Sequence, residues 1–146
     1  MRVKALFDTN VLLDAAMCER PGWAPAMLLL DEIAYESMDG LIAATTLKDL
    51  YYVLSKYRGE AAAREYVEAV IDAFTLIAVD EAVCRSAAKS DEPDFEDGII
   101  RACAEGANAD FIISRDEAAF RTSKVRRLSP QGYVDLFCDV EEVPLD

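Results

Sequence analysis

"VKALFDTNVLLD", residues 3–14, joins two apolar runs through Asp8, Thr9 and Asn10. The first run, residues 3–7, is too short for a helix and is flanked by polar residues, so it predicts a buried strand. A short helix is expected to begin near Asn10. A carboxylate, a hydroxyl and an amide therefore follow the end of a buried strand, which is where open parallel sheets bind their ligands.

The rest of the chain repeats this alternation of short strands and helices. Further strands are expected at residues 41–44, 75–79, 110–114 and 125–128. Helices are expected at residues 24–38, from Thr45 or Thr46 to about Tyr57, at 63–74 and 81–89, in the stretch ending at Gly106, and after Ser129-Pro130. Pro21-Gly22 and Asp39-Gly40 are interpreted as the breaks around the first of these helices. The pattern predicts an α/β fold whose parallel sheet is covered on both faces.

Length and composition indicate one globular domain. The 146 residues fit a single domain, expected over residues 1–138, with a loose tail at 139–146. No apolar run reaches the roughly 18 residues of a membrane span and no signal-peptide pattern opens the chain, so a cytoplasmic location is expected. The chain has no histidine and its four cysteines are scattered. Any chemistry is therefore expected to depend mainly on carboxylates.

The net charge of -13, from 28 acidic and 15 basic residues, argues against a simple binder of polyanions. Divalent cations would cancel part of that charge. The basic residues also gather late in the chain, at Arg115, Arg121, Lys124, Arg126 and Arg127. The group from Lys124 to Arg127 is interpreted first as solvated surface, with contact to RNA as the alternative.

Five aspartates occupy positions suited to a shared site. Asp8 follows the first expected strand and Asp116 follows the fourth by two residues, so neighbouring strands would bring both to one crevice. Asp94 and Asp97 lie three residues apart at a helix start, and Asp49 lies in the first turn of another helix. Carboxylates this close need compensation, and hard cations such as Mg²⁺ or Mn²⁺ prefer oxygen ligands.

Four motifs in this order resemble those of the PIN-domain ribonucleases, which include the VapC-type toxins of bacterial toxin-antitoxin pairs. They are Asp8-Thr9-Asn10, "TTLKDLYYVLSK", and the acid, strand and final acid of "DFEDGIIRACAEGANADFIISRDEAAF". The resemblance extends from Val3 to about Leu136. It implies a five-stranded parallel sheet in the order 3-2-1-4-5 and hydrolysis of RNA with Mg²⁺ or Mn²⁺. It also implies an antitoxin protein as partner and allows a homodimer.

The resemblance also implies roles for single residues. The catalytic and metal-binding acids of the family match Asp8, Asp49, Asp97 and Asp116, with Asn10, Ser114 and Asp94 as supporting residues. Two positions depart from the family pattern. Asp49 stands where many relatives have glutamate, and Gly98 follows Asp97 where alanine is more usual, which adds backbone freedom.

Each of these residues also has a simpler interpretation. Asp8, Asn10 or Asp94 would serve as helix caps, Asp49 and Asp97 as favourable charges in first turns, and Asp116 and Ser114 as local turn and strand-end groups. Glu96 competes with Asp97, since it shares a helical face with Ile99, Ile100 and Cys103.

Two other functions stay open. The first is a noncatalytic PIN-like interaction module that keeps the fold without a working metal site. The second is a phosphoacceptor receiver domain, with Asp80 after the third expected strand. The receiver fits less well, because the late basic residues do not clearly end a strand.

Overall fold

The computed structural model describes residues 2–138, so the expected tail at 139–146 lies outside the described residues. The chain alternates strands and helices as the sequence predicts. Its elements are β1 (Val3–Phe7), α1 (Thr9–Ala16), α2 (Trp23–Ala34), β2 (Met38–Ala43), α3 (Thr46–Arg58), α4 (Glu60–Ala73), β3 (Thr75–Ile77), α5 (Glu81–Lys89), α6 (Phe95–Gly106), β4 (Phe111–Ile113), β5 (Arg126–Leu128) and α7 (Pro130–Phe137).

All five strands pair in parallel, in the order β3-β2-β1-β4-β5. The central strand β1 lies between β2 and β4, and Leu6 is in register with Leu41 on one side and Ile112 on the other. The predicted α/β class and the predicted strand order are both confirmed. The strands that carry Asp8 and Ser114 at their ends are therefore neighbours.

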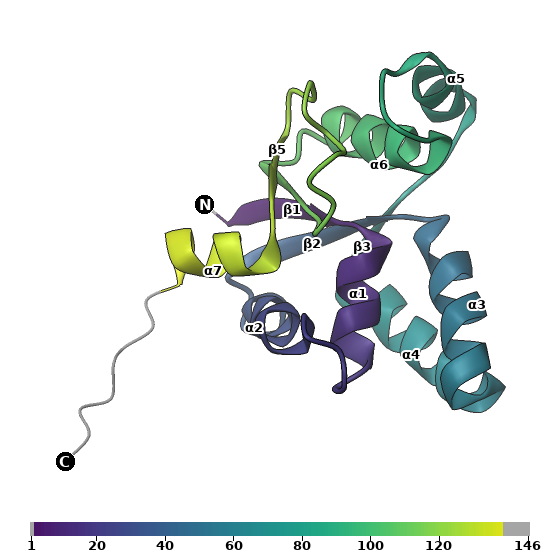
Figure 1. Ribbon diagram of the computed structural model, residues 1–146, viewed down its shortest axis with the longest axis vertical. Coiled ribbons are helices and arrows are strands. Elements are labelled where there is room, and N and C mark those ends of the chain that lie inside the picture. The colour runs from purple at the N-terminus through teal and green to yellow at the C-terminus, as the bar shows by residue number, and fades with distance from the viewer. Residues whose placement is uncertain (1, 139–146) are drawn as a thin grey trace.

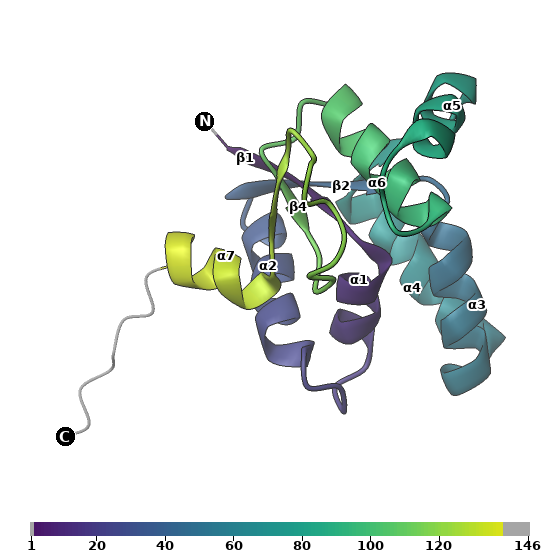
Figure 2. The same ribbon diagram turned by 45° about the horizontal axis from the view of Figure 1, so that its top comes forward.

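Helices cover the two faces of the sheet unequally (Figures 1 and 2). Ala5 and Phe7 face a core shared with α1, α2, α3, α4 and α7. Leu6 faces the opposite core, which is built mainly from α6 and part of α5. Consecutive residues of β1 are thus fully buried on opposite faces, as expected of a parallel sheet between two helical layers.

One predicted boundary is wrong. Asp39-Gly40 is part of β2, which begins at Met38, rather than a break before a later strand. The preceding helix α2 already ends at Ala34, and the chain turns through Glu36, whose φ is 60°. A Cβ atom on Gly40 would lie within 2.7 Å of the Phe74 ring. Glycine is present here because β2 packs closely, rather than because the chain turns.

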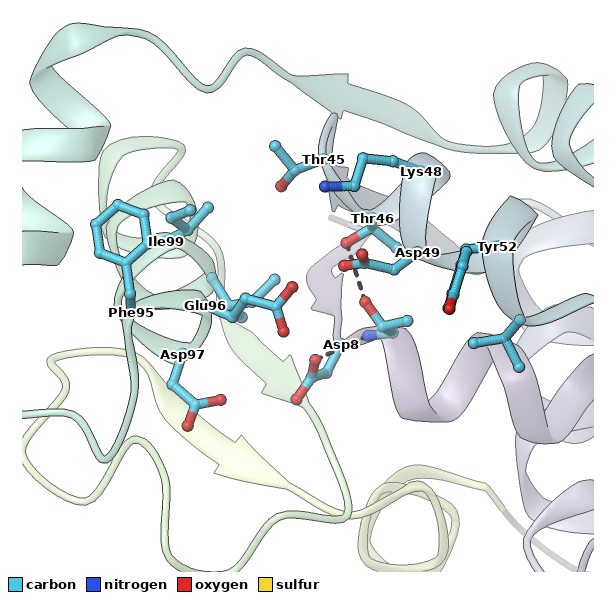
Figure 3. A pocket seen from close by; sticks show the side chains of 13 residues that line it. Asp8, Thr45, Thr46, Lys48, Asp49, Tyr52, Phe95, Glu96, Asp97 and Ile99 are labelled. Carbon is cyan, nitrogen blue, oxygen red and sulfur yellow. Dashed lines mark hydrogen bonds between the residues drawn. The ribbon is translucent and has the colours of Figure 1, made fainter.

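The carboxyl ends of β1 and β4 meet the amino-terminal ends of helices. Helix α1 begins directly after Asp8, and the first turns of α3 and α6 lie beside the same end of the sheet (Figure 3). Helix amino termini favour nearby negative charge. In residues 2–138, no helix is both long enough and apolar enough to cross a membrane.

Candidate active site

Asp8 is both a helix cap and a residue of the candidate site. Its Oδ1 accepts a hydrogen bond from the Thr9 backbone N–H at 2.8 Å, which caps α1. Its Oδ2 accepts from the Ser114 hydroxyl at 2.8 Å. Burial raises the pKa of Asp8 against the lowering effect of these two hydrogen bonds, and the charges of Asp116 and Asp94 raise it further. Capping and a place in the acidic site therefore coexist.

Ser114 and Asn10 connect Asp8 to the loop that follows β4. The fully buried Ser114 hydroxyl accepts from the Asp116 backbone N–H at 3.0 Å while it donates to Asp8. The Asn10 amide donates to Oδ2 of Asp8 at 3.4 Å, and its oxygen accepts from the Arg115 N–H at 3.3 Å. Both residues thus join the ends of two neighbouring strands beside Asp8.

Asp116 lies on the other side of this hydrogen-bond network. Its Oδ1 accepts from the backbone N–H groups of Ala118 and Ala119 at 2.9 and 3.3 Å, so it is also a turn residue. Its charge acts on both Asp8 and Asp97 and raises both pKa values. Asp116 does not line the cleft that Asp8 and Asp97 share.

Helix α6 brings the next acids to the site. Asp94 is its N-cap and accepts from the Asp97 backbone N–H at 2.8 Å. Asp97 is only 8% exposed, and burial raises its pKa to about 7, helped by the charges of Asp94, Asp8 and Asp116. Asp8, Asp97 and Asp116 are therefore close enough to influence one another.

Asp49 lies beside Glu96, a residue whose role the sequence left undecided. Pairing with the Asp49 carboxyl raises the pKa of Glu96, and burial and the charge of Asp49 add to the shift. Glu96 lies one turn before Ile99 and Ile100, which are buried in the core against the sheet. Glu96 lies on the same face of α6 as these two residues but one turn nearer the start of the helix. Its side chain therefore lies past the end of the sheet and lines the cleft.

These acids line a cleft of about 430 Å³ between α3 and α6 (Figure 3). Asp8, Asp49, Glu96 and Asp97 lie around it, and Lys48 is the one basic residue among its lining residues. In the described part of the chain, no group of three or more acidic or cysteine side chains is arranged to hold a metal ion as it stands. The oxygen donors nevertheless suit Mg²⁺, which typically takes one or two protein carboxylates and keeps several waters.

Comparison with known protein families decides the family. The model of the PIN domain matches residues 4–118, which include every acid of the cleft and Asp116. The chain belongs to the PIN-domain family. The resemblance drawn from the four motifs is thereby confirmed. No curated protein in the comparison matches the chain.

Solved structures of low sequence identity share the fold of this PIN domain. The VapBC2 complex of Rickettsia felis bound to a DNA fragment from its promoter gives a TM-score of 0.66 at 12% identity, over 87% of this chain and 98% of that one. VapC20 of Mycobacterium tuberculosis, a toxin that cleaves the Sarcin-Ricin loop, gives 0.64 at 15% identity, over 77% and 90%. A toxin-antitoxin complex from Klebsiella pneumoniae gives 0.62 at 22% identity, over 86% and 97%.

Two buried acids of this PIN domain were not predicted. The Glu92 side chain is 2% exposed and its two oxygens accept from the Phe120 backbone N–H at 2.5 and 3.1 Å. Phe120 has a left-handed φ of 68°, so Glu92 stabilises an unusual conformation of the loop after β4. In the sequence Glu92 is one more acid in an acidic turn, and its partner lies 28 residues away.

Asp14 is the second of these acids. It is 2% exposed at the end of α1 and accepts from Arg115 Nε at 2.5 Å and from Arg20 Nη1 at 3.4 Å. Arg115, whose side chain is half exposed, stands between Ser114 and Asp116, so its ion pair with the buried Asp14 attaches the loop after β4 to α1. Loss of its basic partners would leave the Asp14 carboxylate buried without a counter-charge, which would strongly destabilise the folded protein.

Two of the basic residues late in the chain make contacts within the protein. Arg115 pairs with Asp14, and Arg127 Nη1 donates to the Ser114 backbone oxygen at 2.7 Å. Arg121, Lys124 and Arg126 are exposed. The interpretation as plain solvated surface is therefore wrong for Arg127, which is half-buried and supports the loop beside the acids.

Gly98 beside Asp97 has a packing role. A Cβ atom there would lie 2.8 Å from the Ala87 backbone oxygen and 2.8 Å from Ser90 Oγ, because α5 packs directly against α6. We expect Gly98→Ala to lower the free energy of unfolding by about 1–3 kcal/mol through overpacking, although alanine favours helices. Chemical denaturation measures the change. Gly106→Ala is the control, since nothing lies within 4 Å of its added Cβ, and equal stability of both variants would contradict the packing role.

Proposed function

We propose that this PIN domain is a ribonuclease that uses Mg²⁺ or Mn²⁺ to hydrolyse RNA phosphodiester bonds. The observation that carries the proposal is the group formed by Asp8 and Asp116, which follow the neighbouring strands β1 and β4, and Asp97 in the first turn of α6. Burial raises the pKa values of Asp8 and Asp97, and the charges of the neighbouring acids raise them further. Among residues 2–138, none of the three forms an ion pair with a basic side chain. A divalent cation is the usual compensation for such a group.

The residues divide the work of the reaction. Asp8 and Asp97 would hold the cation directly, and Asp116 and Asp49 would act on it through water. Asn10 and Ser114 orient Asp8, while Asp94 caps α6 and so fixes the start of the helix that carries Asp97. When bound, the cation supplies an activated water and stabilises negative charge on the phosphodiester. In the hydrolysis, the water oxygen would bond to phosphorus and release one proton to solvent, one P–O ester bond would break, and the leaving oxygen would take up one proton.

We also propose that the protein is the toxin of a toxin-antitoxin pair and that an antitoxin protein is its partner. Support comes from the fold shared with a VapC toxin and with two VapBC or toxin-antitoxin complexes. A homodimer and a cytoplasmic location stay predictions. The receiver alternative loses its candidate residue, because Asp80 caps α5 after the edge strand β3 and does not line the acidic cleft.

The test is cleavage of end-labelled RNA by the purified protein. We expect fragments with Mg²⁺ or Mn²⁺ and none with excess EDTA, with activity restored when the cation is added back. The chain has no histidine, so a metal-independent mechanism with a histidine base is not available to it. Gel mapping on total cellular RNA then identifies the bonds that are cut.

The control preparation is Asp80→Asn, which changes an acid of the same kind outside the cleft. It should cut RNA like the wild type. Cleavage that continues unchanged in EDTA would contradict the metal-dependent mechanism. A protein that cuts no RNA and binds no divalent cation, yet captures a partner protein, would instead establish the noncatalytic interaction module.

A further inference from the structure

Helix α3 presents a cation–aromatic–cation stripe beside the acids. Lys48, Tyr52 and Lys56 are spaced four residues apart, which places them on one face of the helix. All three are exposed, and the Lys56 ammonium lies 4.3 Å from the centre of the Tyr52 ring. Lys48 and Tyr52 line the acidic cleft, so the stripe begins at the candidate active site and leads away from it.

The charge of α3 contrasts with that of the whole chain. The helix carries Lys48, Lys56 and Arg58 against one acid, Asp49, whereas the chain has a net charge of -13. Arg58 is already paired with Glu19, so Lys48 and Lys56 are the cations that this helix offers. A polyanion that approaches the acids therefore meets favourable charge along this helix. The basic residues late in the chain, from Arg115 to Arg127, are less available to such a ligand, because Arg115 already pairs with Asp14.

A second exposed aromatic ring lies across the cleft. Phe95, in the first turn of α6, is 51% exposed, and Tyr52 on α3 is 60% exposed. Both line the cleft, and Figure 3 shows them on opposite sides with Asp8, Asp49 and Glu96 between them. Neither ring belongs to the two hydrophobic cores of the described residues. Two rings that do not help to build the core are thus held open to solvent on either side of the acids.

We propose that Tyr52 and Phe95 stack on unpaired bases on the two sides of the cleaved phosphodiester, while Lys48 and Lys56 contact neighbouring phosphates. This inference rests on the proposed ribonuclease function and assigns two aromatic rings and two lysines to the RNA strand that the cleft would hold. Aromatic rings bind unpaired bases with little sequence preference, because every base offers a flat face. Bases inside an A-form duplex are already stacked and cannot reach rings on a cleft wall.

Binding and cleavage of defined RNAs test the proposal. Binding is measured by fluorescence anisotropy in the Asp8→Asn background with Mg²⁺, and kcat/KM is measured in the wild-type background. We expect Tyr52→Leu and Phe95→Leu each to raise Kd by about 5-fold or more, as loss of one base–aromatic stack does. Tyr57→Leu is the matched control, because Tyr57 is 64% exposed on the same helix but does not line the cleft. It should change Kd by less than twofold.

An abasic nucleotide next to the cleavage site separates stacking from a general effect of mutation. If Tyr52 stacks on that base, the protein with Tyr52 binds the abasic RNA more weakly than the intact RNA. The Tyr52→Leu variant binds the abasic RNA no more weakly than the intact RNA. Two lysine–phosphate contacts also predict that log affinity falls with log salt at a slope of about 1.4. A slope of about 4 or more would indicate more phosphate contacts than these two lysines can make, and would mean that RNA binds at another basic surface.

The outcomes separate this proposal from the proposed function. If Asp8→Asn abolishes cleavage but Tyr52→Leu and Phe95→Leu both bind and cut like the wild type, the stacking proposal alone is wrong. Equal cutting of duplex and single-stranded RNA overturns it as well. If the wild type never cuts RNA but binds single strands through Tyr52, the stacking surface is supported and the ribonuclease function is wrong.

Discussion

Asp8→Asn is expected to lower the rate of RNA cleavage by at least about 10²-fold, the loss typical when one group is removed from a preorganised electrostatic site. The substitution removes the charge at the end of the central strand β1, beside Asp97 and Asp116. It leaves the local structure largely intact. Asparagine caps helices about as well as aspartate, so the amide oxygen can still accept from the Thr9 backbone N–H.

Single-turnover cleavage of a short labelled RNA measures this loss, with thermal unfolding as the check on folding. Asp80→Asn is the matched control, because Asp80 caps α5 in the same way by accepting from the Val83 N–H at 3.0 Å. Asp116→Asn should behave like Asp8→Asn, since its amide oxygen can still accept from the Ala118 and Ala119 N–H groups. Undiminished cleavage in both Asp8→Asn and Asp116→Asn would show that the chemistry takes place elsewhere.

The site acids differ in how far sequence could place them. Asp8 directly follows the strand β1, whose last three residues are buried, so its position at the carboxyl end of the sheet follows from the local sequence pattern alone. Its proximity to Asp116 depends on strand order, which came from the family resemblance. The pairing of Asp49 with Glu96 depends on where α3 and α6 lie across the cleft, and periodicity within either helix cannot supply that.

The same limit explains the residues that were missed. Asp14 lies 101 residues from Arg115, and nothing local distinguishes a buried, paired acid from an exposed one at the end of a short helix. In β2, local turn chemistry suggested a break at Asp39-Gly40. Packing against Phe74 and pairing with β1 prevail over it. Sequence thus predicts where elements and strand-end acids occur, while contacts between distant segments decide boundaries and partners.

The metal-free protein is expected to become less stable as the pH rises from about 4 to about 7, and Asp97→Asn is expected to remove the largest part of this change. The pKa of Asp97 is about 7 in the folded protein, against an ordinary value of 3.8 for an aspartate in the unfolded chain. Between these values the folded state keeps a proton that the unfolded state has released, so rising pH favours unfolding. The stabilising contribution is complete below 3.8 and lost above about 7.

At about 1.4 kcal/mol per pKa unit, the contribution of Asp97 is on the order of 2–4 kcal/mol, since part of the shift is shared with its acidic neighbours. Asp8 has a raised pKa too, so a smaller dependence should persist in Asp97→Asn. Acids with lowered pKa values, such as Asp91 and Glu105, do not mask the effect. They lose their stabilising contribution only as the pH falls below the ordinary pKa values of their side chains, 3.8 for aspartate and 4.5 for glutamate.

Urea denaturation in EDTA at pH 5 and pH 8 measures this change, with Asp72→Asn on the exposed face of α4 as the control acid. Mg²⁺ should stabilise the wild type more at pH 8 than at pH 5, because the cation binds the ionised carboxylates. It should stabilise Asp97→Asn much less at either pH. A metal-free wild type equally stable at both pH values would mean that Asp97 is not held at raised pKa. Equal stabilisation of Asp97→Asn by Mg²⁺ would remove Asp97 from the proposed metal ligands, so the two measurements test the electrostatic and the metal-binding parts of the site separately.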